Sequence, residues 1–406
     1  MTRIMSRFAR GLIAASVLAL LLVACEDAEE TTDDEPEDEA EAEPDEAADD
    51  DDEADEADDE DEADHEDAEA DDEADHEADE ADEADDVDFG DEVTLTFGHP
   101  FPPTDPIQVN VWEPWVEDVR EATDGTVDVE IHAGGALAGG DAIYENVVAG
   151  AQDIGWTMPG YTPGRFPITQ IIEAPFVFED AVQGTEVAHE LWDEFDAFRD
   201  EYDDTEVLAL WAMDTGDLFT RDEPVETLED VEGLTVRSPA PLQTDALEEM
   251  GASATGMPGP EIYDSIERGV IDGYKLANSA TRVFDLGDTT DYRTECNCYT
   301  GAFVLVMSPA AWEQLSPAQQ DAIADLTGND LALELAEAHA AAAAEVEEEY
   351  WPEHDVEAVE LSDDEFDRWF EAVDPVFQSW IEEREEEGVP GTEMADRVFE
   401  LTGRGE

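Results

Sequence analysis

Lysine is almost absent from this sequence: Lys275 is the only one, and the other basic residues are arginines. The 16 Lys and Arg residues stand against 116 Asp and Glu residues, which gives a formal net charge of -100 at pH 7. A surface dense in carboxylates stays hydrated in concentrated salt, where screening removes much of its self-repulsion. The composition therefore predicts a halophilic source, and it argues against binding to nucleic acid or to anionic lipid surfaces.

Cysteine is also scarce, with only three residues: Cys25, Cys296 and Cys298. The Cys-Asn-Cys spacing at 296–298 supplies too few ligands for a metal site, so no metal is predicted. A disulfide that closes so short a loop is strained, although an exported protein allows one. Two unpaired thiols on one face of a strand are slightly favoured here, and the disulfide stays open as the alternative.

The common catalytic motifs are missing. The sequence has no Gly-x-Ser-x-Gly, no His-Glu-x-x-His, no phosphate-binding loop of the Walker type and no Gly-x-Gly-x-x-Gly,. Its histidines are scattered, so no residue is predicted to be catalytic. We therefore expect a protein that is not an enzyme and that uses no cofactor. An extracytoplasmic hydrolase or lyase is the less favoured alternative.

The first 25 residues have the features of an export signal. Arg3, Arg7 and Arg10 precede an apolar run over residues 11–24, which is too short to span a bilayer comfortably,. The run ends in Leu-Val-Ala-Cys, which resembles a bacterial lipobox, so Cys25 is the predicted lipidation site. A signal peptide that happens to contain a cysteine is the alternative. The sequence thus predicts an extracytoplasmic protein, lipid-anchored to the cell membrane in the periplasm or on the outer face.

Residues 26–91 consist almost entirely of Asp, Glu and Ala. Such a segment buries too little apolar surface to offset the entropy of ordering, and its like charges repel one another. We expect a disordered acidic tether that holds the folded part away from the lipid. Weak binding of divalent cations by His65 and His76 is the minor alternative.

The remaining residues, about 92–406, are long enough for two domains with substantial cores. Predicted strands and helices alternate along them, and this alternation predicts an α/β fold built from parallel-sheet units. Five consecutive alanines near residue 340 favour one long helix there. The predicted strands are 93–97, 126–131, 153–156, 207–211, 234–237, 270–272 and 303–307, and the predicted helices are 107–123, 141–148, 181–202, 239–250, 262–268, 316–350, 362–387 and 391–401.

The few cationic side chains are the candidate ligand-binding residues, since an arginine kept in so acidic a chain suggests a fixed partner. Arg237 closes the strand 234–236, where a guanidinium can hold a carboxylate by two parallel hydrogen bonds,. A structural ion pair is the alternative for Arg237. Lys275 is expected at another strand end, with a surface position as the alternative. Arg165, within Pro-Gly-Arg-Phe-Pro, either anchors its loop or lines the pocket.

His99 lies at the end of the first predicted strand, where α/β folds place ligands,. An ordinary loop position is equally compatible with this pattern. His99 is therefore included among the candidate ligand-binding residues.

Residues 93–387 resemble the solute-binding subunit of tripartite ATP-independent periplasmic (TRAP) transporters, of the dicarboxylate-binding type. The third and fourth of the matching segments, in this order and at this spacing, are the most specific. The matching segments are 95–99, then 155–178 with Pro-Gly-Arg-Phe-Pro and Pro-Phe-Val-Phe, then 224–239 with Gly-Leu-Thr-Val-Arg-Ser-Pro, and finally 250–253 with 257–263 and 269–273.

The resemblance implies a periplasmic-binding-protein-like fold of two α/β domains that close on a ligand, with a long helix contacting both. We expect domain I at 92–214 and 303–342, and domain II at 215–302 and 343–406. The resemblance also implies that Arg237 pairs with a substrate carboxylate.

Two departures from the family pattern bear on the ligand. The position of a second arginine found in some members falls near Asp217, with Arg221 a few residues away. Tyr274 and Lys275 replace the Ala-Glu-Asn-Pro-like segment of many members, so both are candidate ligand-binding residues and the ligand need not match theirs.

These observations predict a protein that captures a small organic acid by domain closure and delivers it to the two integral-membrane TRAP subunits. A receptor for an ABC importer or a sensor with the same fold is the alternative. The neighbouring genes would separate these readings.

Overall fold

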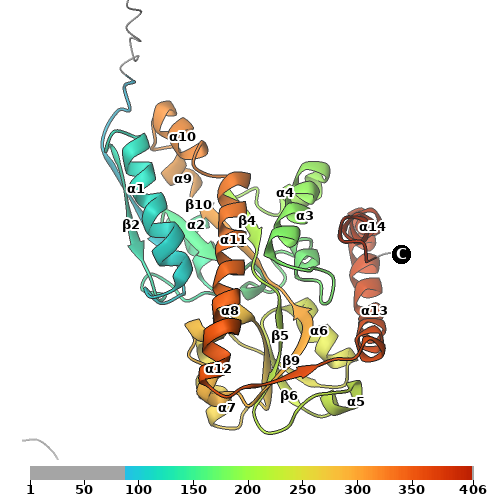
Figure 1. Cartoon of the computed structure of the whole chain (residues 1–406). Coiled ribbons are helices and arrows are strands. Elements are labelled where there is room, and N and C mark those ends of the chain that lie inside the picture. Colours follow the sequence, from blue (N-terminus) through green and yellow to red (C-terminus); the bar gives the residue numbers. More distant parts are fainter. Residues whose placement is uncertain (1–86, 405–406) are drawn as a thin grey trace, which may run out of the picture. The chain divides into compact units, whose positions relative to one another are not determined.

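The computed structural model of the chain describes residues 87–404 (Figure 1). The predicted signal peptide, the lipidation site Cys25 and the acidic segment up to residue 86 lie outside the described residues, together with His65 and His76. All described residues belong to one compact unit. Its strands form two sheets, each with its own helices, and we call these halves lobe 1 and lobe 2.

Lobe 1 is built on a five-stranded sheet in the order β2-β1-β3-β10-β4. The strand β1 pairs in parallel with β2 and β3, whereas β10 runs antiparallel between β3 and β4. The sheet is therefore mixed, although the sequence pattern indicated parallel units. The bounds are β1 Val93–Gly98, β2 Val127–His132, β3 Ile154–Thr157, β4 Glu206–Ala212 and β10 Ala302–Met307.

The helices of lobe 1 lie against this sheet, with α1 packed on β2 and α3 on β4. Aromatic side chains fill the space beneath them, and Trp112, Trp156 and Trp211 are fully buried. The helical elements are η1 Gln108–Trp112, α1 Glu113–Ala122, α2 Ile143–Val148, η2 Pro159–Tyr161, η3 Thr169–Glu173, α3 Ala181–Glu194, α4 Asp196–Asp200, α9 Pro309–Trp312 and α10 Pro317–Ala324.

Lobe 2 is built on a six-stranded sheet in the order β11-β9-β5-β8-β6-β7. The strand β6 pairs in parallel with β7 and β8, and β5 runs antiparallel to β8 and β9. The elements are β5 Gly216–Thr220, α5 Leu228–Val231, β6 Thr235–Ser238, α6 Pro241–Glu249, β7 Ser253–Gly256, η4 Gly259–Glu261, α7 Ile262–Glu267, β8 Gly273–Ala277, α8 Asn278–Val283, η5 Gly287–Thr289, β9 Tyr292–Tyr299 and β11 Glu357–Glu360.

Two strand connections join the lobes and lie side by side. The chain passes from β4 to β5 through residues 213–215 and returns from β9 to β10 through residues 300–301. Met213 donates its backbone N–H to the carbonyl of Gly301 at 2.9 Å, and the Thr300 hydroxyl donates to the carbonyl of Met213 at 3.0 Å. The two crossings are thus tied to each other by hydrogen bonds.

The helix α11, Asn329–Glu345, contacts α3 and β4 of lobe 1 and α8 of lobe 2 (Figure 1). It continues into η6 Val346–Tyr350 and α12 Trp351–Glu353. One long helix over 316–350 was predicted, and this is wrong, because α10 ends at Ala324 and a new helix begins after Gly328. Gly328, the residue before α11, has a φ of +75°, which breaks the helical path and which glycine adopts at no steric cost,.

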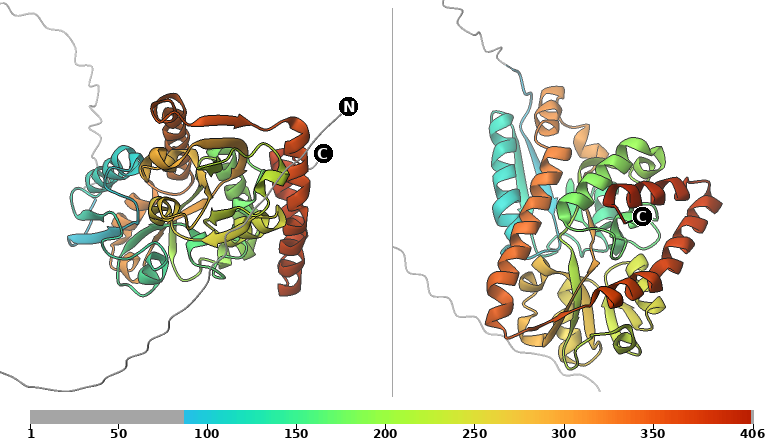
Figure 2. Two further views of the ribbon diagram at one scale, coloured as in Figure 1. Left: turned by 90° about the horizontal axis from the view of Figure 1, so that it is seen from below. Right: turned by 45° about the vertical axis from the view of Figure 1, so that its right-hand side comes forward.

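The C-terminal helices are α13 Asp363–Glu387, which packs on α6 of lobe 2, and α14 Gly391–Thr402, which contacts α3 of lobe 1 (Figure 2). The Ser362 side chain caps α13 by accepting from the backbone of Glu365 at 3.2 Å, and Gly388 ends the helix with a φ of +84°,. These local signals are why both helices agree with the sequence prediction within a residue or two.

Three further predictions need correction. The strand expected at 270–272 lies at Gly273–Ala277, because the chain at Val270 is exposed and the strand's hydrogen-bonding partners begin at Gly273. The helix expected at 181–202 is interrupted at Phe195, whose backbone is extended. The thiols expected to be unpaired form a disulfide between Cys296 and Cys298, since both side chains project from the same face of β9.

Among residues 87–404, no helix is both long and apolar enough to cross a membrane.

Candidate ligand-binding site

A cavity of about 270 Å³ lies where loops of the two lobes meet. Lobe 1 supplies the segment after β1, the glycine-rich turns near residue 140 and Tyr161, while lobe 2 supplies the segment before and within η4. A small organic acid needs a space of about this size, since ligand pockets in proteins start near 300 Å³. The lining residues are Pro100, Phe101, Gly134, Gly135, Gly139, Gly140, Asp141, Tyr161, Pro258, Pro260 and Glu261.

Arg237 does not line this cavity itself, but it is hydrogen-bonded to the segment that forms the lobe 2 part of the wall. It is the third residue of β6, at the carboxyl end of a strand that pairs in parallel with β7 and β8. Its Nε donates to the carbonyl of Met257 at 3.0 Å, and its Nη1 donates to the carbonyl of Lys275 at 2.8 Å. Met257 directly precedes the cavity-lining Pro258, so these bonds hold the guanidinium beside the cavity wall.

The charge of Arg237 has no counter-ion. Nine of the twelve arginines in residues 87–404 form an ion pair with a carboxylate. Arg237 is one of the three that do not, and it alone of these is buried, with 1% of its surface exposed. Its Nη2 forms no hydrogen bond with another described residue, so it is available to an anion that enters the cavity.

Lys275 is also buried without a counter-ion, but it lies within β8 and not at the strand end that the sequence predicted. Its Nζ donates to the side-chain carbonyl of Gln243 on α6 and sits 5.8 Å from the ring centre of Phe176. Burial lowers the pKa of Lys275 to about 7, so the amine is partly neutral near neutral pH,.

Glu173 is a site residue that the sequence reasoning missed. It ends η3 in lobe 1, is 1% exposed, and its two carboxylate oxygens have no hydrogen-bond partner among the described residues. Burial raises the pKa of Glu173 to about 8,. The Gln243 side-chain amide donates to the backbone carbonyl of Glu173, so Gln243 links this residue to Lys275 across the two lobes. No local pattern in the sequence distinguishes Glu173 from the many exposed acids.

Aromatic rings form the wall behind the cavity. Phe101 stacks on Trp156 with ring centres 4.4 Å apart and on Phe284 of lobe 2 at 6.2 Å. Phe303 meets Phe101 edge-on at 5.6 Å. Gly259 leaves room for the Phe284 ring, since a Cβ at this glycine would lie 2.4 Å from it. Of these rings, Phe101 lines the cavity, and Tyr161 adds a second aromatic ring to the wall.

Of the other predicted site residues, His99 lies within the same aromatic cluster, 5.0 Å from Trp156, and burial lowers its pKa to about 4. Neither of its ring nitrogens has a partner among residues 87–404. Tyr274 instead belongs to the core of lobe 2, where it stacks on Phe219 and its hydroxyl contacts the hydroxyl of Thr290. Arg165 pairs with Asp204 within lobe 1, so its charge is already matched.

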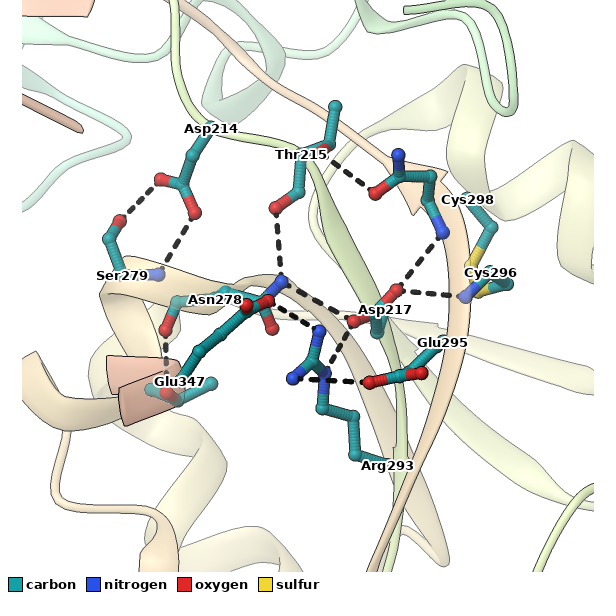
Figure 3. Close-up of polar contacts among 12 residues, drawn as sticks. Asp214, Thr215, Asp217, Asn278, Ser279, Arg293, Glu295, Cys296, Cys298 and Glu347 are labelled. Atoms are coloured by element: carbon teal, nitrogen blue, oxygen red, sulfur yellow. Dashed lines mark hydrogen bonds and ion pairs between the residues drawn. A yellow bond between two sulfur atoms is a disulfide. The ribbon is translucent and has the colours of Figure 1, made fainter. Parts of the chain in front are cut away.

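A second set of buried polar groups lies at the strand crossings (Figure 3). Asp214 accepts hydrogen bonds from the backbone and hydroxyl of Ser279, and burial raises the pKa of Asp214 to about 7. His339 of α11 approaches the same carboxylate at 3.8 Å, and burial lowers the pKa of His339 to about 3. These groups bring the β4–β5 crossing, α8 and α11 together.

Asp217, near which the sequence resemblance placed the position of a second arginine, binds an arginine of this chain. Arg293 on β9 donates from Nε to the Asp217 carboxylate at 2.6 Å and also pairs with Glu347 at 2.7 Å (Figure 3). Asp217 also accepts the backbone N–H groups of Cys296 at 2.9 Å and Asn297 at 3.0 Å. Arg221, the other candidate near this position, pairs with Glu267.

The fold and the cavity define the class of protein. Two α/β lobes are joined by adjacent crossings, and the cavity between them has aromatic lining residues and lies close to a buried arginine with no ion-pair partner among residues 87–404. This is the architecture of a two-lobed receptor for a small organic anion.

Comparison with known proteins identifies the family. The sequence model of the bacterial extracellular solute-binding proteins, family 7, matches residues 97–384, and the chain belongs to this family. Three solved TRAP solute-binding proteins are similar to it. One from a marine metagenome, specific for aromatic acids and bound to metahydroxyphenylacetate, is 26% identical and has a TM-score of 0.73, covering 77% of this chain and 99% of its own.

A second, from Rhodoferax ferrireducens and bound to benzoate, is 28% identical with a TM-score of 0.73 and covers 77% and 98% of the two chains. The third, from Bordetella bronchiseptica and bound to mandelate, is 25% identical with a TM-score of 0.72 and covers 77% and 100%. The chain is therefore a TRAP-type, extracytoplasmic solute-binding protein, as the sequence resemblance implied.

Proposed function

We propose that this protein captures an aromatic carboxylate outside the cytoplasmic membrane and delivers it to the TRAP membrane subunits. The observation that carries the proposal is Arg237, a buried cation without a counter-ion beside an interlobe cavity. A carboxylate is the natural partner of such a group, because a guanidinium binds it through two parallel charge-assisted hydrogen bonds.

The aromatic part of the proposal rests on the cavity wall. Phe101 and Tyr161 line the cavity, and Trp156 and Phe284 pack against the ring of Phe101. Aromatic pairs gain about 0.5–1.5 kcal/mol beyond the burial of their area, which favours a flat ring over an aliphatic or sugar acid. The three similar structures named above, described with aromatic acids as ligands, support the same choice.

We propose that binding is coupled to closure of two domains, at 92–214 with 303–342 and at 215–302 with 343–406. The hydrogen-bonded crossings at Met213 and Gly301 would be the hinge. Closure excludes water from the Arg237 guanidinium, and a charge-assisted hydrogen bond is stronger at the lower local dielectric. The helix α11 contacts α3 of lobe 1 and α8 of lobe 2, and the linked helices α14 and α13 contact α3 of lobe 1 and α6 of lobe 2; these contacts would guide the movement.

A thermal-shift screen in high salt tests the ligand class. We expect benzoate, hydroxybenzoates and mandelate to raise the melting temperature, because a ligand that binds only the native state stabilises it by mass action. Glucuronate and succinate serve as non-aromatic acids, and toluene serves as an aromatic compound without a carboxylate. A shift with the sugar acid or dicarboxylate and none with any aromatic acid would contradict the aromatic proposal.

We further propose that the protein is anchored to the membrane by lipid on Cys25, with residues 26–91 as an acidic spacer, and that it works in a saline environment. The leader sequence and the excess of acidic residues support this. Replacing Cys25 with serine should move the protein from the membrane fraction to the soluble exported fraction. Retention of the Cys25→Ser variant in the membrane after a high-salt wash would argue against the lipid anchor.

A further inference from the structure

Among residues 87–404, Glu173 is the buried acid whose carboxyl oxygens make no hydrogen bond of good geometry, although the backbone N–H of Ala302 lies near enough to lower its pKa slightly against the larger, raising effect of burial. Among residues 87–404, the acids with less than a tenth of their surface exposed are Asp105, Glu173, Asp214 and Asp217. Asp105 accepts the backbone N–H of Ile107, and Asp214 and Asp217 accept the bonds described above. Buried polar groups are nearly always hydrogen-bonded, so the exception at Glu173 asks for a partner.

The Glu173 carboxyl lies at the contact between the lobes, beside the segment that contributes Tyr161 to the cavity wall. A Cβ added to Gly160 would be 2.9 Å from its Oε1 and 2.8 Å from the Cβ of Ala240 in lobe 2. Gly160 directly precedes Tyr161, which lines the cavity. Because Gly160 has no side chain, the Glu173 carboxyl can approach the backbone segment that carries Tyr161 into the cavity wall.

The surroundings of Glu173 hold it in place from both lobes. Gln243 of α6 donates to its backbone carbonyl, and Lys275 of β8 donates to the Gln243 side chain. Burial raises the pKa of Tyr299. Arg237 and Glu173 both lie near enough to Tyr299 to make smaller contributions to this pKa. Arg237 donates to the backbone carbonyl of Lys275, so hydrogen bonds through Lys275 and Gln243 connect Arg237 to the backbone of Glu173. The carboxyl is thus positioned, while its oxygens make no hydrogen bond of good geometry with residues 87–404.

The proton on Glu173 fits a role next to an anionic ligand. Because burial raises the pKa of Glu173 to about 8, the carboxyl is mostly neutral at pH 7. A neutral carboxyl does not repel the ligand carboxylate held by Arg237, and it both donates and accepts a hydrogen bond. A hydroxyl group has the same two capacities, so it satisfies Glu173 in either direction.

We propose that Glu173 is a specificity-determining residue that selects carboxylates carrying a hydroxyl group, as a second hydrogen-bonding point of the cavity beside Arg237. This inference rests on the proposed capture of an aromatic acid. A ligand without the hydroxyl leaves the buried carboxyl unpaired, and sites built to bind a hydroxyl discriminate strongly against analogues that lack it.

Calorimetry with matched pairs of ligands tests this role. The 2-, 3- and 4-hydroxybenzoates are each compared with the methylbenzoate of the same substitution, which has nearly the same shape and no donor, and with benzoate itself. The proteins are the wild type, Glu173→Leu, Glu173→Gln and the control Glu201→Gln. Glu201 is another acid of lobe 1, but its oxygens already accept the N–H groups of Ile168 and Thr169.

We expect the wild type to bind at least one hydroxybenzoate about 10- to 100-fold more tightly than its methyl partner. Glu173→Leu should lose this preference while it still binds benzoate, Glu173→Gln should keep part of it, and Glu201→Gln should keep all of it. Equal affinity of wild type for both members of every pair would overturn the inference, and so would an unchanged preference in Glu173→Leu.

Two further results separate the possible failures. Equal weakening of all ligands by Glu173→Leu and Glu173→Gln would mean that Glu173 only supports the fold, and the inference would fall while the aromatic ligand stands. Failure of every benzoate to bind the wild type would refute the aromatic ligand itself.

Discussion

Replacing Arg237 with alanine is the most direct test of the site. The guanidinium is 1% exposed, and its bonds to the carbonyls of Met257 and Lys275 leave Nη2 and one N–H of Nη1 for the ligand. A charge-assisted hydrogen bond contributes about 1.5–3 kcal/mol, and the variant would also strand the ligand carboxylate in a buried place. We expect a loss of at least ~2 kcal/mol, which is about a 30-fold increase in Kd.

Isothermal titration calorimetry with the best ligand of the thermal-shift screen measures this loss. Arg221→Ala is the matched control, since Arg221 lies in the same lobe and its charge is already paired with Glu267. Arg237→Lys should bind with intermediate affinity, because an ammonium keeps the charge and loses the planar pair of donors. The measurements are made at low and at high NaCl, because salt screens exposed charges much more than buried ones.

The ratio of the two Kd values, variant over wild type, should therefore change little with salt. An Arg237→Ala variant that folds as the wild type does and binds with unchanged Kd would refute the assignment of the carboxylate to Arg237. An equal loss in Arg221→Ala would show that the effect comes from the net charge of the lobe.

Three other predictions concern stability. Arg293→Met should lower the free energy of unfolding by about 3 kcal/mol, because it leaves Asp217 buried without its ion-pair partner,; urea denaturation measures this, and Asp217→Asn in the same chain should recover part of the loss. The pKa of Glu173 is about 8 in the folded state against an ordinary value of 4.5, so between these pH values the native state keeps a proton that the unfolded chain releases. The resulting contribution to the free energy of unfolding is complete below pH 4.5 and is lost as pH rises through 8,. Urea midpoints between pH 5 and 8 should accordingly fall less steeply in Glu173→Gln than in the wild type, and identical slopes would contradict the assigned pKa. Raising NaCl should increase the melting temperature, because 116 acidic residues repel one another; a melting temperature independent of salt would argue against the halophilic interpretation,.

Much of the fold could be predicted where local signals decide it. The bounds of α13 and α14 follow from Ser362, Gly388 and Pro390, which act through the backbone next to them. The buried strand β10 is an almost unbroken apolar run. The family resemblance supplied what local signals cannot, namely that these elements form two lobes.

The prediction failed where distant pairing decides. The strands β5 and β9 were not predicted, because polar residues such as Asp217 and Arg293 interrupt them and become compatible with strands only by pairing with each other. The same holds for β8, which carries Lys275 in a buried position. A sequence pattern suggests that each of these charged side chains is exposed. Asp217 is buried only because it pairs with Arg293, more than 70 residues away, and Lys275 is buried beside Gln243, 32 residues away.

The site residues also fall into those that local sequence signals predict and those that depend on contacts between distant segments. Arg237 could be found because charge is scarce and the residue sits in a specific motif. Glu173 and Gln243 could not, since an acid among 116 and a glutamine carry no signal until the lobes bring them together. The two cysteines were correctly expected on one face of a strand, but the strain expected for so short a loop led to the wrong prediction that they are unpaired.

The burial of the only lysine has a practical consequence for chemical labelling. Reagents that acylate amines have one side-chain target in this protein, and Lys275 is 1% exposed and held by Gln243, whose amide also reaches lobe 1. Modification of Lys275, followed by mass spectrometry of its peptide, would therefore report how often the surrounding contacts open. The rate should fall when a ligand holds the lobes together, so the natural sequence already contains a single reporter of closure.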